Sequence, residues 1–187
     1  MSFKDFLTEY KKQHKSMVFD IDDTLITTDA KIKVQLDGKT IKSLTPEEFN
    51  TYKLKKGETF NFEDFTSSEV LKTTGKKTKY WQIAQNVNNA VKRGMSDSVL
   101  YVLTARPKEA KSKLHKYLIS QGLSELKLDN VYTVGNRGET MSVAQLKKNV
   151  LKQIAKHHEE LVFFDDDTAN VKLANELKAV TARLVRK

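Results

Sequence analysis

Apolar runs and amphipathic segments alternate along most of the chain, and this alternation predicts its elements. We predict strands where apolar residues run together, and helices where apolar residues recur every three or four positions. The predicted strands are residues 17–19, 99–103, 130–134, 161–164 and 180–185. The predicted helices are residues 77–93, 107–121, 142–157 and 168–178, with Gly94 and Gly122 ending the first two.

Strands that alternate with helices form a parallel sheet covered by helices on both faces. We therefore predict an α/β protein with a three-layer, Rossmann-like parallel sheet. At 187 residues the chain has the size of a single domain. The apolar faces that should meet the sheet are Tyr80, Ala84, Val87 and Val91 in the first helix, and Val143, Leu146, Val150 and Ile154 in the third.

Two of the predicted strands run directly into acidic residues. Asp20 and Asp22 follow the first strand, and Asp165 and Asp166 follow the strand 161–164. Ligands bind beyond the carboxyl ends of the strands in open α/β sheets, so we expect the two clusters to meet there. Carboxylates that gather in this way suit Mg²⁺, which takes one or two of them together with substrate phosphate and water.

Residues 27–75 depart from the alternation and form a predicted insertion. Apolar residues alternate with polar ones at 32–36, and Asp37-Gly38 follows, which predicts a β-hairpin whose return strand passes through Ile41. The insertion leaves the sheet just after the first acidic cluster. We therefore expect it to lie over the site as a small cap or flap.

A short helix and a further strand are predicted in the second half of the insertion. Thr45 and Glu48 have the spacing of a capping box, with Pro46 at the first helical position. The further strand is expected to pack on the hairpin through Phe60, Phe62 and Phe65.

The composition of the chain restricts the metal sites, the cellular location and the partners that we expect. The chain has no cysteine, which excludes disulfides and thiolate metal sites. Residues 1–16 lack the apolar core of a signal peptide and fit a short amphipathic helix, and no apolar run is long enough to cross a membrane. We expect a cytoplasmic protein, in the host cytoplasm if it is viral. The net charge of +9 favours anionic partners such as nucleotides or nucleic acid, although scattered lysines also simply solvate a surface.

Four segments together resemble the motifs of the haloacid dehalogenase-like superfamily, and specifically its phosphatases. Asp20-Ile21-Asp22-Asp23-Thr24 resembles the first motif, and the strand that ends at Thr104 resembles the second. Lys147 is the candidate for the third; Lys148 and Lys152 are close alternatives, and Lys147 is preferred because it follows the apolar Leu146. The fourth motif matches the strand that ends in Asp165-Asp166. The chain resembles phage members of the superfamily, including the phosphatase part of polynucleotide kinase-phosphatase.

The resemblance implies a role for each motif residue. Asp20 would attack phosphorus and form an aspartyl-phosphate, while Asp22 would protonate the leaving oxygen and then activate water. Mg²⁺ would be held by the Asp20 carboxylate, the Asp22 backbone carbonyl and Asp165, with Asp166 close by. Thr104 would hydrogen-bond a phosphoryl oxygen, and Lys147 would offset negative charge.

Further substrate contacts are expected from two residues. Thr24 is a candidate for substrate binding. Arg106, in Thr-Ala-Arg, resembles the Ser-Gly-Arg of the phage kinase-phosphatases; it is interpreted either as a phosphate clamp or as a surface charge. Asp23 stands where many members of the superfamily have glycine, and no role is assigned to it.

The leading hypothesis is a Mg²⁺-dependent phosphomonoester hydrolase that acts on a nucleotide or a polynucleotide 3′-phosphate. A catalytically idle nucleic-acid-binding or assembly protein and a phosphotransferase are the alternatives. A calcium loop that begins at Asp20 is disfavoured, because its sixth and twelfth positions are Leu25 and Lys31 instead of glycine and glutamate. The sequence does not indicate an oligomeric state.

Overall fold

A five-stranded parallel sheet forms the centre of the computed structural model, which describes residues 15–135 and 141–186. Its strands lie in the order β10-β9-β1-β7-β8, and every neighbouring pair is parallel. Their bounds are β1 Lys15–Phe19, β7 Leu100–Pro107, β8 Val131–Gly135, β9 Glu160–Asp165 and β10 Val180–Leu184. The predicted α/β, Rossmann-like architecture is therefore confirmed. The predicted N-terminal helix falls outside the described residues, apart from Lys15 and Ser16, which belong to β1.

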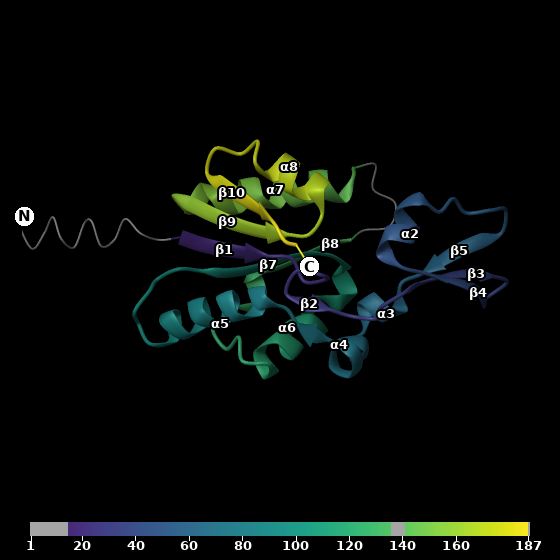
Figure 1. The fold of residues 1–187 in the computed structure, drawn as a ribbon, viewed down its shortest axis with the longest axis horizontal. Helices are drawn as coiled ribbons and strands as arrows, with labels where there is room; N and C mark the ends of the chain where they lie inside the picture. The colour runs from purple at the N-terminus through teal and green to yellow at the C-terminus, as the bar shows by residue number, and fades with distance from the viewer. Residues whose placement is uncertain (1–14, 136–140, 187) are drawn as a thin grey trace, which may run out of the picture.

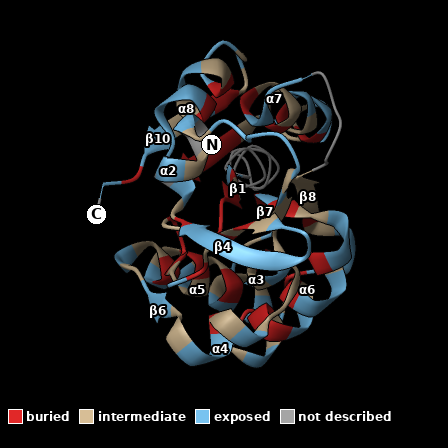
Figure 2. Cartoon of the chain, turned by 90° about the vertical axis from the view of Figure 1, so that its right-hand side faces the viewer, coloured by how far each residue is buried: buried red, intermediate tan, exposed pale blue. Residues whose placement is uncertain are grey.

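Helices cover both faces of this sheet, as Figure 1 shows. Two of them, α5 (Lys79–Lys92) and α6 (Lys111–Ser120), pack on one face, and α7 (Val143–Ile154) and α8 (Thr168–Ala174) pack on the other. Successive strand residues point to opposite faces, so Phe19 joins the core beneath α5 and α6 while Val18 joins the core beneath α7. Figure 2 shows the buried residues on the sheet and on the inner sides of these helices.

Several predicted boundaries were wrong by a few residues. The strand predicted at 99–103 continues to Pro107, and the helix predicted from 107 begins with the 3₁₀ turn η1 (Lys108–Ala110). The helix predicted at 168–178 ends at Ala174. Two further 3₁₀ turns are η2 (Leu128–Asn130) and η3 (Ala155–His157).

The buried side of α7 differs from the face that the apolar pattern predicted. Ala144, Lys147, Leu151 and Ile154 are buried, whereas Val143 is 39% exposed. The charged side chain of Lys147 thus faces the core, whereas the pattern placed its neighbour Leu146 there. The helix α5 shows a similar shift, because its buried residues are Trp81, Ala84 and Asn88.

The predicted insertion is a separate small antiparallel sheet with three short helices. β2 (Ile26–Thr27) pairs with β6 (Lys76–Lys77), so the two ends of the insertion lie side by side. Between them lie β3 (Ile32–Leu36), β4 (Lys39–Leu44) and β5 (Glu58–Asn61), in the order β4-β3-β5, with β4 mostly exposed (Figure 2). The helices are α2 (Pro46–Thr51), α3 (Glu63–Thr66) and α4 (Glu69–Thr74).

The hairpin turn and the helix cap of the insertion form as predicted, whereas one predicted strand is shorter than expected. Asp37 and Gly38 both have positive φ (49° and 77°), as a tight hairpin turn requires, and Thr45 caps α2 in a complete capping box. The strand predicted through the three phenylalanines ends at Asn61, however. Phe65 lies on α3 and still reaches the core of the insertion.

Among the described residues, no helix has both the length and the apolar character needed to span a membrane.

Candidate active site

The strand order places the predicted acidic clusters next to each other. β1 lies between β7 and β9, and Phe19 at its end is level with Phe164 on one side and Val102 on the other. Asp20 therefore leaves the sheet beside Asp165. The chain order also reverses between β1 and β9, which is where open α/β sheets bind their ligands.

A tight turn carries Asp20 and Asp22 away from β1. The backbone N–H groups of Leu25 and Ile26 both donate to the carbonyl of Ile21, at 3.0 and 2.9 Å, and these three apolar side chains are fully buried. Asp23 lies at φ 58°, a left-handed conformation that L-residues other than Asn and Asp seldom adopt. This backbone explains physically why glycine also suits the position.

A buried lysine lies between the two acidic clusters. Lys147 is 2% exposed, and its Nζ lies 3.0 Å from Asp20 Oδ1 and 2.7 Å from Asp165 Oδ2. Burial alone would lower the pKa of Lys147, but the two carboxylates more than offset it and raise that pKa. Among the three candidate lysines, Lys147 contacts both acids, whereas Lys148 pairs with Glu176 at the surface and Lys152 is exposed.

Asp165 is held by four hydrogen bonds in addition to its burial. Its oxygens accept from Lys147 Nζ (2.7 Å), from Asn170 Nδ2 (2.9 and 3.1 Å) and from the backbone N–H of Asp167 (2.9 Å). Sequence reasoning missed Asn170, since a single asparagine one turn into a helix gives no motif. Asp167 caps α8 through its side chain, so one member of the acidic run does serve as a helix cap.

Three carboxylates converge on one point beyond the strand ends. Asp20, Asp165 and Asp166 each offer one oxygen, and these atoms lie within 4.8 Å of one another. Burial, and then the negative charge of Asp165, raises the pKa of Asp166 to about 6. Burial raises the pKa of Asp20 well above its usual range despite the opposing effect of Lys147. A cation in this position would favour the charged form of all three side chains.

The donor set fits a hard divalent cation. Carboxylate oxygens are the ligands that Mg²⁺ prefers, and the three converging acids leave coordination positions for water and phosphate. The Asp22 carboxylate is not part of this group, and the expected contact of its backbone carbonyl with Mg²⁺ stays a prediction.

Thr24 contacts an acid of the cluster in this structure. Its side chain is fully buried, and Oγ1 donates to Asp166 Oδ1 at 3.3 Å. The hydroxyl of Thr78 in turn donates to the Thr24 carbonyl. The described geometry therefore gives Thr24 a part in placing Asp166, while its predicted contact with substrate stays a prediction.

Arg106 is inside the protein, so its interpretation as a surface charge was wrong. It is 1% exposed, and its Nε and Nη2 donate to Asp22 Oδ2 and Oδ1 at 2.9 and 2.7 Å. Burial acts to lower the pKa of Arg106, but Asp22 reverses the shift and raises it. The guanidinium thus faces the predicted acid.

Thr104 occupies the predicted position near the end of β7. It is 1% exposed, and its Oγ1 accepts a hydrogen bond from the Arg106 backbone N–H at 3.3 Å. The hydroxyl hydrogen is not used in that contact, so it can donate to a phosphoryl oxygen.

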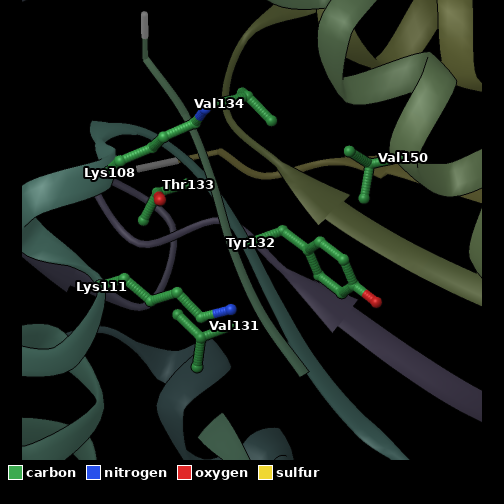
Figure 3. Close-up of a pocket in the computed structure, with 7 residues that line it drawn as sticks. All are labelled: Lys108, Lys111, Val131, Tyr132, Thr133, Val134 and Val150. Atoms are coloured by element: carbon green, nitrogen blue, oxygen red, sulfur yellow. The ribbon is translucent and has the colours of Figure 1, made fainter. Parts of the chain in front are cut away.

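A cavity of about 330 Å³ follows the free edge of β8. Figure 3 shows Lys108 and Lys111 on one side of β8, and Tyr132 and Val150 on the other. Lys111 lies 6.0 Å from the centre of the Tyr132 ring. Among the described residues, neither lysine forms an ion pair.

The structure arranges the eight predicted site residues in two contacting groups. The first group is Asp20, Lys147, Asp165, Asp166 and Thr24. The second group is Asp22, Arg106 and Thr104, and Asp22 follows Asp20 by two residues in the same turn. No protein-family model matches the chain, and no curated protein matches its sequence.

Proposed function

We propose that this protein is a Mg²⁺-dependent phosphomonoester hydrolase that acts through an aspartyl-phosphate on Asp20. The observation that supports this most is the buried cluster at the strand ends. There Asp20, Asp165 and Asp166 converge, and Lys147 neutralises only part of their charge. Residues from three of the four motifs that resemble those of haloacid dehalogenase-like phosphatases, the first, third and fourth, form this cluster.

The chemistry explains why so much positive charge is needed. A carboxylate and a phosphate oxygen at about 4 Å repel by roughly 4 kcal/mol per pair of unit charges at an effective dielectric constant of about 20. When bound, Mg²⁺ screens this repulsion and polarises the phosphoryl group. Lys147 contributes a further positive charge, 3.0 Å from Asp20 Oδ1.

In the first step, an oxygen of the Asp20 carboxylate forms a bond to phosphorus while the bond from phosphorus to the ester oxygen breaks. Asp22 gives its proton to that leaving oxygen. In the second step, Asp22 takes a proton from water, the water oxygen attacks phosphorus, and the Asp20 carboxylate leaves. Thr104 donates its hydroxyl hydrogen to a non-bridging phosphoryl oxygen in both steps.

The substrate class proposed is a nucleotide or a polynucleotide that ends in a 3′-phosphate. The cavity beside β8 supports it, because Lys108 and Lys111 can pair with phosphate while Tyr132 offers an aromatic surface to a base. The net charge of +9 favours the same anionic partners.

Phosphate release tests the reaction class. Purified protein is incubated with an aryl phosphate, mononucleotides, 3′- and 5′-phosphorylated oligonucleotides and sugar phosphates, with Mg²⁺ or with EDTA. We expect phosphate release that requires Mg²⁺ and is abolished in Asp20→Asn. Asp129→Asn, at an exposed position outside the cluster, serves as the matched control and should keep full activity.

The same experiment separates the alternatives. Asp20→Asn activity equal to that of the native protein would rule out the nucleophile. Transfer of phosphate to an added alcohol instead of water would indicate a phosphotransferase. Tight, salt-sensitive binding to oligonucleotides without turnover would favour an idle nucleic-acid-binding protein.

A further inference from the structure

Arg106 joins three parts of the chain that are distant in sequence. From β7 its guanidinium reaches Asp22, in the turn after β1, and the backbone carbonyl of Phe65, on α3 of the insertion. The Nη1–O distance to Phe65 is 3.3 Å, and the Arg106 Cζ lies 5.4 Å from the centre of the Phe65 ring. Phe65 in turn belongs to the apolar core of the insertion.

The backbone around Arg106 is shaped to hold it in this place. The register between β7 and β8 shifts between Thr104 and Pro107, an irregularity that re-aims a side chain at the end of a strand. Gly135 on β8 packs against this distortion: a Cβ there would lie 1.9 Å from the Ala105 carbonyl oxygen. The fold therefore accommodates the distorted strand with a residue that has no side chain.

The contacts of the Arg106 guanidinium distinguish a clamp that binds phosphate from a residue that holds Asp22. A clamp would direct its fork of N–H groups at the phosphate, whereas here Nε and Nη2 are both used on the two oxygens of Asp22. Asp22 keeps 24% of its side chain exposed, while Arg106 keeps 1%. The acid therefore faces the open side of the site, and the arginine lies behind it.

We propose that Arg106 is a positioning residue that holds Asp22 in place to protonate the leaving group, and that its anchor on Phe65 makes the insertion part of this support. This inference rests on the proposed function, because it takes Asp22 as the general acid. The guanidinium donates to both oxygens of Asp22, so it fixes the orientation of that carboxyl group.

The two roles predict different dependence on the leaving group. A clamp on the non-bridging oxygens acts on every phosphate monoester, so its loss lowers kcat/KM by a similar factor for all of them. An acid is needed only where the leaving oxygen is basic. Loss of the acid, or of the residue that positions it, should therefore slow alkyl phosphates strongly and activated aryl phosphates little.

The experiment measures kcat/KM with Mg²⁺ for an alkyl phosphate, phenyl phosphate and a nitrophenyl phosphate. The variants are Asp22→Asn, Arg106→Met, Arg106→Lys and the double variant Asp22→Asn/Arg106→Met. We expect Asp22→Asn and Arg106→Met to lose about 10²–10⁴-fold on the alkyl ester, the usual contribution of a general acid, and less than about tenfold on the nitrophenyl ester. The double variant should be no slower than the slower single variant, because Arg106 acts only through Asp22.

Two further variants keep the test decisive if Arg106→Met does not fold. Phe65→Leu removes the ring contact but keeps the carbonyl, and it should show the same leaving-group pattern with a smaller loss. Arg183→Met changes an exposed arginine on β10 and should leave the pattern unchanged. Circular dichroism and the melting temperature identify the folded variants.

A uniform loss across the three esters, or losses that multiply in the double variant, would overturn the positioning role and indicate a direct contact with phosphate. That result would leave the proposed function intact, because the native protein would still hydrolyse the esters. A native protein that releases no phosphate from any ester would contradict the proposed function itself.

Discussion

Lys147→Met should destabilise the protein strongly, because it removes the only side-chain cation that contacts both Asp20 and Asp165 among the described residues. Methionine retains most of the lysine stem, so the buried space stays filled. The ammonium disappears from its positions 3.0 Å from Asp20 and 2.7 Å from Asp165. Both carboxylates are then left buried with reduced compensation, since Asp20 is 6% exposed and Asp165 0%.

The expected loss in the free energy of unfolding is the difference between the lost ion-pair attraction and the recovered cost of burying the ammonium. Each ion pair at about 3 Å is worth roughly 5–6 kcal/mol at an effective dielectric constant of about 20. The cost of burying the ammonium, several kcal/mol, cancels much of the sum. Removing one partner of a buried pair typically costs about 3–5 kcal/mol, and we expect that range here. In a chain of this size it corresponds to a melting temperature lower by roughly 10 °C.

Urea unfolding followed by circular dichroism measures the free energy of unfolding of both proteins. Lys148→Met is the matched control, because Lys148 pairs with Glu176 on the surface, where such pairs contribute about 1 kcal/mol or less. Mg²⁺ should restore part of the stability that Lys147→Met loses, since a ligand that binds only the folded state stabilises it. Equal losses for the two variants, or a loss for Lys147→Met below about 1 kcal/mol, would refute the electrostatic account of this cluster.

Three further substitutions test other parts of the structure. Asp23→Gly should change the free energy of unfolding by less than about 1 kcal/mol, whereas Asp23→Val should cost about 1–3 kcal/mol, because a β-branched residue tolerates the left-handed backbone poorly; equal urea midpoints would contradict this. Asn170→Ala should weaken Mg²⁺ binding by about 10–100-fold in a calorimetric titration, because it frees the Asp165 carboxylate to rotate; unchanged affinity would exclude that role. Lys111→Met should lower kcat/KM for a nucleotide several-fold and leave an aryl phosphate unaffected; a parallel loss on both substrates would show that the cavity does not bind the nucleotide.

The sheet and the meeting of the two acidic clusters could be predicted because both depend on short-range signals. Apolar runs ending in acids mark buried parallel strands, and parallel strands bring their carboxyl ends to one edge. Asp20 and Asp165 therefore meet as expected. The hairpin at Asp37-Gly38 could also be predicted from the sequence, since only a few residue types adopt its positive φ values easily.

Other contacts depend on long-range packing that leaves no periodic signal. The apolar pattern placed Leu146 on the buried side of α7, whereas the structure buries Lys147. The charge of Lys147 is compensated by Asp20, just after β1, and by Asp165, at the end of β9. Asn170 and the pairing of Arg106 with Asp22 are of the same kind. Phe65 keeps its predicted place in the core of the insertion, but it does so from a helix, because strand β5 ends four residues earlier.

Trapping the covalent intermediate tests the central claim most directly. Native protein is mixed with an aryl phosphate and Mg²⁺ and quenched in acid during turnover. The protein is then digested, and the masses of its peptides are measured by mass spectrometry. We expect one added phosphoryl group on the peptide that contains Asp20, absent from Asp20→Asn and from samples with EDTA. Rapid turnover with no phosphorylated peptide at any quench time, or a phosphoryl group on a different residue, would contradict the assignment of Asp20 as the nucleophile.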